Sequence, residues 1–249
     1  MSRKPKVPGH AEYEALAKDA QKRLRRLTAR LASGKIDVDA WQDGFHAILF
    51  DGHSDAWAMG RQRSGVPGAR DEDDERFGLD AADGQDEFLT PFAQALKDKD
   101  PRYFDEEGAL RIDAVNDRNA LYVARMRGTA NEAFVESSED DDLFDWVLGS
   151  GDSCEDCPEL AGLSPYTKAT MISHPGDGQT ECLGNCTCTL KRRRGDLSGF
   201  DRPDIYRAGE KTPSDQETPE APKPDDSPTE PVLLRKGERK PGIPLPPRS

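Results

Sequence analysis

The chain has 249 residues, of which 34% are hydrophobic and 33% are charged, and its formal net charge is −13. This length accommodates one or two domains, and the low apolar content predicts a modest hydrophobic core. An acidic chain of this kind is a poor candidate for an autonomous nucleic-acid-binding protein, because such proteins need basic surface.

The chain carries no membrane or export signal that we can identify. No segment approaches the ~20 apolar residues that a membrane span requires, and the polar start of the chain has no apolar run typical of a signal peptide. We therefore expect a protein that is made and used on the cytosolic side of a cell, without contact to a membrane.

Residues 1–63 are predicted to form basic amphipathic helices. Apolar side chains recur at three- and four-residue steps from Tyr13 to Leu31, which predicts a helix over residues 11–32. Gly34 can supply the left-handed turn that ends it.

A second helix is expected to begin after Asp37, which can act as its N-cap, and to bury Trp41 on its apolar face. Small side chains follow at four-residue steps and would admit another helix at close range: Gly52, Ala56 and Gly60.

Residues 64–143 are predicted to contain an acidic loop and a helical part. Residues 64–86 are rich in Gly, Asp and Glu, which indicates a loop. Thr90 as N-cap with Pro91 in the first turn predicts a short helix. A longer helix, capped by Asp113, is expected to run to about residue 136.

Residues 144–194 are predicted to form a cysteine-rich β-ribbon, and residues 207–249 a disordered Pro-rich tail. Residues 144–148 and 186–190 alternate between apolar and polar side chains, which indicates two strands. We expect the strands to pair as an antiparallel ribbon with a long loop between them. The predicted fold class is therefore α+β, mainly helical at first and followed by this small ribbon.

All cysteines of the chain lie in this part: Cys154, Cys157, Cys182, Cys186 and Cys188. Two thiolates in a C-x-x-C turn can bind one zinc ion, and Cys182 with Cys186, or Cys186 with Cys188, could complete the four ligands. His174 could replace one sulfur. A structural zinc is the favoured interpretation for a chain without a secretory signal. Two disulfides with one free thiol are the alternative.

Other charged or titratable groups carry weaker signals. His46 and His53 share a helix face and could contact a ligand or a metal, although ordinary surface or interfacial histidines explain them more simply. The acidic runs at 71–75 and 139–142 lack the spacing of a calcium loop and indicate solvated loops. The basic run at 191–194 could contact DNA or an acidic protein.

No sequence motif of an enzyme is present. The chain has no phosphate-binding glycine loop, no dinucleotide fingerprint, no H-E-x-x-H and no nucleophile elbow. We therefore expect no catalytic residues, no organic cofactor and no enzymatic activity.

The order of these features resembles the minor head, or head-morphogenesis, proteins of tailed bacteriophages (the Mu-type group). The resemblance covers roughly residues 15–194 and is carried by residues 31–57, residues 122–146 and above all residues 152–188, with C-E-D-C, H-P-G-D-G and C-L-G-N-C-T-C. Family members similarly end in C-R-C or H-x-x-C-R-C. This chain departs from that pattern, because Thr187 stands at the arginine position and the histidine is displaced to His174.

The resemblance implies a structural protein of the virion, present in few copies inside the capsid near the portal and assembled in the cytoplasm of the bacterial host. It implies the portal protein, the major capsid protein or both as partners, with packaged DNA as a further contact through the basic segments. The alternative is a cytosolic zinc-binding regulatory module that contacts nucleic acid or an acidic protein partner.

Overall fold

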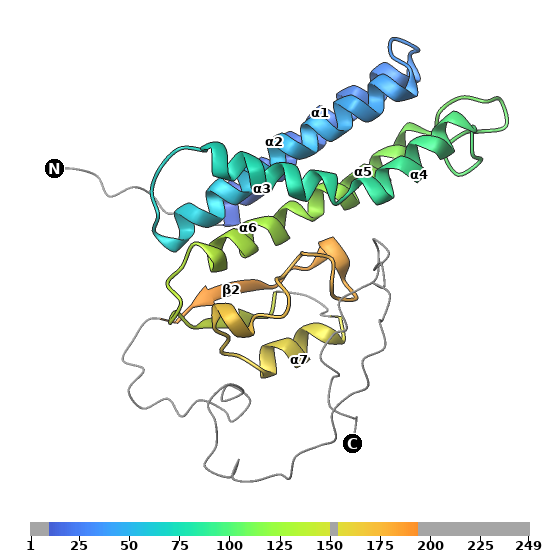
Figure 1. Cartoon of the computed structure of the whole chain (residues 1–249). Coiled ribbons are helices and arrows are strands. Elements are labelled where there is room, and N and C mark those ends of the chain that lie inside the picture. The colour runs from blue at the N-terminus through green and yellow to red at the C-terminus, as the bar shows by residue number, and fades with distance from the viewer. Residues whose placement is uncertain (1–9, 150–153, 194–249) are drawn as a thin grey trace, which may run out of the picture. The chain divides into compact units, whose positions relative to one another are not determined.

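The structure, a computed structural model, describes residues 10–149 and 154–193, and all of them belong to one compact unit (Figure 1). In these ranges six α-helices precede the first strand of a two-stranded antiparallel sheet. A short helix and two 3-10 turns lie between the two strands. The predicted α+β class is confirmed. The tail predicted at 207–249 lies outside the described residues.

The first two helices form where the apolar spacing predicts them. Helix α1 spans His10–Ala32, and Gly34 follows in a left-handed conformation with φ of 67°. Helix α2 spans Val38–Ser64, and the Asp37 side chain accepts a hydrogen bond of 2.8 Å from the Ala40 N–H. This bond satisfies one of the N–H groups that a helix start leaves without a partner.

The acidic segment that we predicted as a loop is a helix, so that prediction was wrong. Helix α3 spans Glu72–Asp83. Asp71 accepts a hydrogen bond from the Asp74 N–H (3.1 Å), and Asp74 accepts one from the Asp71 N–H (3.0 Å). Carboxylates in the first turn favour a helix because they cap its free N–H groups and face the positive end of its dipole. The acidic run was a helix start.

Helix α4, Asp86–Lys97, also begins earlier than we predicted. Thr90 is not its N-cap, and Pro91 lies inside the helix, where its missing N–H forgoes one backbone hydrogen bond. Side chains on both sides of the proline are buried and compensate for that loss: Leu89, Phe92, Ala93 and Leu96. The burial of these side chains outweighs the local preference of Thr90 and Pro91 for a helix start.

The single long helix that we predicted over 113–136 is two helices. Helix α5 spans Ile112–Ala124, with Asp113 in its first turn, and helix α6 spans Met126–Glu136. At the break, the Arg125 N–H bonds the Tyr122 carbonyl at 3.2 Å, one residue short of the α-helical partner. The 3-10 turn η2, Leu183–Asn185, packs against the break from a distant part of the chain.

Helix α2 lies at the centre of the helical part and contacts α1, α3, α4, α5 and α6. The small residues along α2 permit the close approach of α6, as the sequence predicts. A Cβ atom at Gly52 would lie 2.2 Å from Met126 Cε, and one at Gly60 would lie 2.2 Å from the Ala130 carbonyl oxygen. Aromatic side chains fill the helical core, among them Trp41, Phe45, Phe92 and Tyr122.

The predicted antiparallel ribbon is present, but its second strand begins later than expected. Strand β1, Phe144–Val147, pairs with β2, Thr189–Arg192, and Trp146 lies opposite Leu190. Cys186 and Cys188 therefore precede the second strand instead of forming it. Leu148, which we placed in the first strand, lies beyond its end and is 42% exposed.

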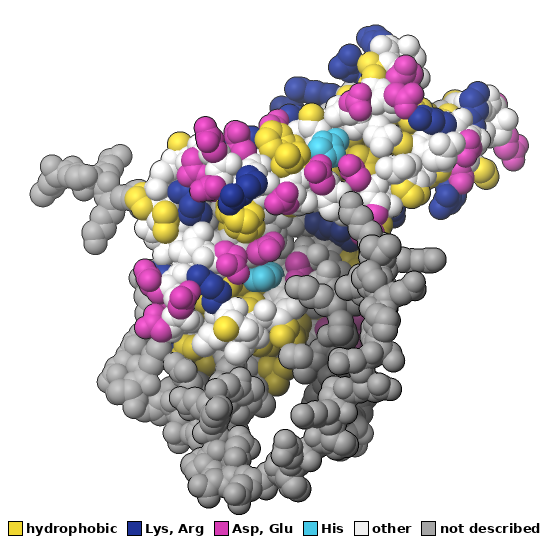
Figure 2. Space-filling view, viewed as in Figure 1, with side chains coloured by type: hydrophobic (Ala, Val, Ile, Leu, Met, Phe, Trp, Pro, Cys, Tyr) yellow, Lys and Arg dark blue, Asp and Glu magenta, His cyan; other side chains and the backbone are white. Residues whose placement is uncertain are grey.

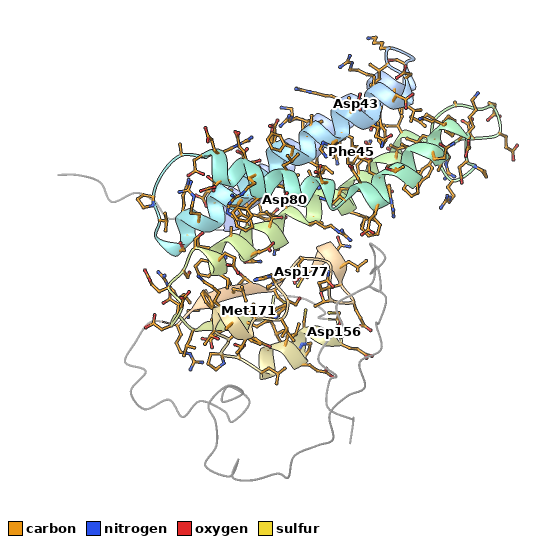
Figure 3. All side chains as sticks on the ribbon, in the orientation of Figure 1. Asp43, Phe45, Asp80, Asp156, Met171 and Asp177 are labelled. Carbon is orange, nitrogen blue, oxygen red and sulfur yellow. The ribbon has the colours of Figure 1, made fainter. Side chains whose placement is uncertain are left out.

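Within this compact unit, residues 144–149 and 154–193 form a smaller part that we call the cysteine lobe. It contains the ribbon, helix α7 (Asp156–Gly162), η1 (Lys168–Thr170) and η2. Its hydrophobic cluster is separate from the helical core and includes three of the thiols. Figure 3 places Met171 in this lobe, away from Phe45 in the helical core.

Candidate metal centre

Two short helical turns position the cysteines. Cys154 precedes α7 and Cys157 lies in its first turn, so both thiols come from one end of a helix. Cys182 and Cys186 flank η2, in which Leu183 adopts φ of 51°. The sulfurs on both sides of this turn reach the Cys157 sulfur.

The sulfur atoms converge on Cys157. Its Sγ lies 3.4 Å from that of Cys154, 3.8 Å from that of Cys182 and 3.6 Å from that of Cys186. Four sulfurs bound ~2.3 Å from a tetrahedral zinc ion lie about 3.8 Å from one another. The three distances from the Cys157 sulfur are therefore close to this separation, whereas no four of the sulfurs in the described residues all lie within 4.8 Å of one another.

The five thiols form two overlapping groups. In one group the sulfurs of Cys154, Cys157 and Cys182 lie within 4.8 Å of one another, and in the other those of Cys157, Cys186 and Cys188 do. Cys157 belongs to both. All five cysteines are free thiols, and together they form a cluster that could bind a metal.

Ionisation of two of the clustered thiols, Cys157 and Cys186, is opposed by their surroundings. Burial raises the pKa of Cys186 to about 12, and burial together with the neighbouring thiols raises the pKa of Cys157 as well. Burial also opposes ionisation of Cys154, but hydrogen bonds from Cys157 and Cys182 outweigh it and lower that pKa. A bound divalent cation would favour the thiolates, because its charge dominates such a site.

Backbone contacts hold the two cysteine-bearing segments against each other. The Glu155 N–H donates to Glu181 Oε2 at 3.3 Å, and the Glu181 N–H donates to Asp156 Oδ2 at 2.8 Å. Thr180 Oγ1 lies 3.2 Å from the Cys182 sulfur. These reciprocal bonds fix the distance between the segments, and the sequence alone offered no indication of them.

His174 is positioned by a different network. Its backbone N–H donates to Asp177 Oδ2 at 2.7 Å, and Ser173 Oγ donates to the same oxygen at 2.9 Å. Burial lowers the pKa of His174, and its Nε2 is buried without a hydrogen-bond partner among the described residues. In that part of the chain, the groups of potential ligands that lie within 4.8 Å of one another do not include His174 with the thiols.

The two histidines of α2 have different environments. His53 is 2% exposed and bonds Thr129 Oγ1 through Nδ1 at 2.7 Å, while Gln85 donates to its Nε2. This side chain links helices and is not part of any group of candidate ligands in the described ranges. His46 lies near the surface, with Nε2 2.9 Å from Asp83 Oδ1 and 3.9 Å from an Asp86 oxygen.

The basic run that ends the cysteine lobe is partly neutralised by nearby acidic side chains. Arg192 pairs with Asp142 at 3.0 Å, and Arg193 pairs with Asp145 at 2.6 Å. On the face of the molecule in Figure 2, acidic and basic side chains are interspersed over the helices. Residue 194 lies outside the described residues. These pairs reduce the positive charge that this run could offer to DNA.

No protein family, no curated protein and no solved structure matches this chain. Among the helices of residues 10–149 and 154–193, none is long and apolar enough to cross a membrane.

Proposed function

We propose that the five-cysteine cluster holds a structural zinc ion. Cys154 and Cys157 would supply two thiolates, and the segment from Cys182 to Cys188 would supply the other two. The convergence of sulfurs from two segments on Cys157, each at about the separation of two zinc-bound thiolates, carries this proposal. Bound zinc supplies strong bonds between the two segments. A shell of four thiolates leaves no open position for a substrate, so the role is structural.

The elements of the cysteine lobe are short enough to need such a link. Strands β1 and β2 have four residues each, and α7 has seven. Isolated helices of this length and two-stranded ribbons are marginal in water. A metal bound between distant segments stabilises the folded lobe because the unfolded chain has no preformed site.

We further propose that the protein is a minor structural component of a tailed-phage head, located near the portal. Two observations support this. The motifs that resemble the phage family coincide with the thiol cluster, and the helices extend from this lobe as a bundle with a mixed charged surface. The proposed role is docking on portal or capsid subunits, without enzymatic activity.

Metal analysis tests the first proposal. The protein purified under reducing conditions should contain about one zinc per chain. A chelator should change the near-ultraviolet circular dichroism of Trp146, which packs in the same cluster as the thiols, and should leave most of the helical signal in the far ultraviolet. A chain without metal that contains two disulfides would contradict the proposal.

Analysis of phage particles tests the second proposal. Mass spectrometry of purified heads should detect the protein in a few copies, and deletion of its gene should give defective heads. Absence from purified heads, together with salt-sensitive DNA binding by the isolated protein, would favour a regulatory module instead.

A further inference from the structure

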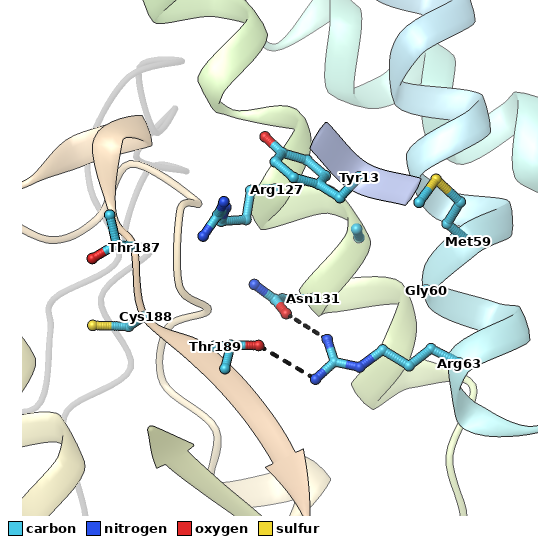
Figure 4. Close-up of a pocket in the computed structure, with 10 residues that line it drawn as sticks. Tyr13, Met59, Gly60, Arg63, Arg127, Asn131, Thr187, Cys188 and Thr189 are labelled. Carbon is cyan, nitrogen blue, oxygen red and sulfur yellow. Dashed lines mark hydrogen bonds between the residues drawn. The ribbon is translucent and has the colours of Figure 1, made fainter. Parts of the chain in front are cut away.

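A cavity of about 260 Å³ lies between α1, α2, α6 and the start of β2. Figure 4 shows Arg63 and Arg127 reaching into this region from two helices, with Asn131 between them. Thr189 lies on the opposite wall, and the sulfur of Cys188 is turned away from Arg63. The cavity therefore has two guanidinium groups in its wall and lies beside the cysteine lobe, next to Cys188.

Arg63 has only neutral partners among the described residues. It donates to Asn131 Oδ1 at 3.1 Å, to Thr189 Oγ1 at 3.4 Å and to the Leu190 carbonyl oxygen. Its guanidinium also lies 4.2 Å from the centre of the Phe134 ring. Burial lowers the pKa of Arg63, which is the direction expected for a cation that has lost water without gaining a carboxylate.

These contacts fix the position of Arg63, and some of its N–H donors remain without an acceptor in the described residues. Asn131 is 3% exposed, and its Nδ2 donates to the Pro175 carbonyl oxygen at 2.8 Å, which holds the amide oxygen toward Arg63. A guanidinium has five N–H donors. Three of those on Arg63 have acceptors in the described part of the chain, which leaves two for a ligand.

Arg127 brings a second positive charge with a single acidic partner in the described ranges. It bonds Glu14 Oε1 at 3.3 Å and lies 4.8 Å from the centre of the Tyr13 ring. The side chain of Arg127 is 16% exposed, so it is held by these contacts. Two guanidinium groups against one carboxylate leave a surplus of one positive charge at the cavity.

We propose that this Arg63–Arg127 cavity binds a phosphate group. Guanidinium forks match phosphate oxygens and bind them through charge-assisted hydrogen bonds. The volume of the cavity exceeds that of a single water molecule many times and admits a phosphate with part of its hydration shell. The phosphate can belong to a nucleic-acid backbone or to a small phosphorylated compound, because both present the same oxygens.

Titration of the metal-loaded full chain with inorganic phosphate at constant ionic strength tests this proposal. Phosphorus NMR should detect saturable binding of the phosphate. In proton–nitrogen NMR spectra of the protein, the backbone amide signals of Asn131 and Thr189 should shift. Arg63→Gln should weaken binding about tenfold or more, since a charge-assisted hydrogen bond contributes about 1.5–3 kcal/mol. Arg127→Gln should weaken binding as well and leaves the contacts of Arg63 with β2 in place.

Arg76→Gln is the matched control, because it removes one positive charge from an exposed position that pairs with Asp73. It should leave phosphate binding unchanged. The proposal is overturned if the wild-type chain shows no saturable binding, or if Arg76→Gln weakens binding as much as the cavity variants do. Competition by a short thymidine oligonucleotide would assign the phosphate to nucleic acid, and lack of competition would assign it to a small compound.

Discussion

The helical part and the cysteine lobe achieve stability by different means. In the helical part, long helices bury aromatic rings in contact, with Trp41 and Phe45 centroids 5.0 Å apart and Trp41 and Phe92 centroids 5.3 Å apart. In the cysteine lobe, strands of four residues contribute side chains to a hydrophobic cluster that also includes thiols. A long helix can bury a continuous apolar stripe, whereas short elements need links between segments that lie far apart in the chain.

Helix α6 joins the two regions. Its first residue, Met126, packs in the helical core, while Phe134 and Val135 pack in the cluster of the cysteine lobe. The bond from Arg63 to the Leu190 carbonyl adds a second link, from α2 to β2. Loss of order in the lobe should therefore leave the helical core largely intact, since that core is completed by other helices.

Replacement of the central thiol should have the largest effect. We expect Cys157→Ser to abolish metal binding and to remove protection from amide exchange across the cysteine lobe, because structural zinc sites contribute about 10–16 kcal/mol in small metal-binding peptides. Hydrogen exchange with mass spectrometry measures this. Ile172→Ser, at a site that is 55% exposed in the same lobe, should bind metal normally. Full metal content in Cys157→Ser would refute the role of this thiol.

Loss of a buried ion pair in the helical part should have a smaller effect and should lower the free energy of unfolding by several kcal/mol. Asp74 is fully buried and accepts two hydrogen bonds from Arg61, at 3.0 Å and 2.6 Å. Asp74→Asn should destabilise the protein by about 3–5 kcal/mol, because it removes the buried carboxylate of a mostly buried guanidinium and leaves only the exposed Asp71 carboxylate, 3.4 Å away. Asp73→Asn, whose side chain is 78% exposed, should cost less than about 0.5 kcal/mol. Urea denaturation measures the unfolding free energy of both variants. Equal losses in the two variants would contradict the stabilising role of the buried Asp74 carboxylate.

The contact between α2 and α6 can be tested by one methyl group. A Cβ atom at Gly60 would lie 2.7 Å from Ala133 Cβ and 2.9 Å from the Phe134 nitrogen. Gly60→Ala should therefore cost about 1–3 kcal/mol through overpacking. Gly162→Ala in α7 is the matched control, since a Cβ there has no atom within 4 Å. That variant should be neutral or stabilising by up to about 1 kcal/mol in thermal unfolding.

His53 should make the helical part sensitive to acid. Burial, and to a lesser degree the charge of Arg125, lowers the pKa of His53 from 6.5 to about 3. Below pH 6.5 the unfolded chain binds a proton that the folded chain does not bind, so stability present at neutral pH falls as the pH drops toward 3. The loss should be about 1–2 kcal/mol between pH 6.5 and 5.

Denaturation of His53→Gln across this pH range checks the histidine effect. The variant should show a shallower decline of the unfolding free energy than the wild-type chain, whatever its stability at neutral pH. An unchanged slope would mean that other groups cause the acid sensitivity.

Local patterns predicted the elements whose stability depends on neighbours in the chain. The apolar stripe of α1, the N-cap at Asp37 and the small residues facing α6 were all predictable, because each depends on residues three or four positions apart. The acidic start of α3 was misread as a loop, although the reciprocal spacing of Asp71 and Asp74 is itself a local cap signal.

Other features were not predictable because distant packing overrides local preference. Pro91 is accommodated inside α4 by buried side chains around it, and the helix predicted over 113–136 breaks at Arg125, against which η2 packs. Within the candidate site, the position of Cys157 between the other thiols depends on the meeting of two segments some twenty-five residues apart.

The amino-acid sequence by itself determined that five thiols would gather in one part of the chain, and that amphipathic helices would precede a short ribbon. Tertiary structure alone decided which thiol lies at the centre, that His174 belongs to another network, and that Arg63 meets no carboxylate within residues 10–149 and 154–193. Spacing along the chain governs which face of an element a side chain occupies. The partner that it meets on that face depends on how separate elements pack.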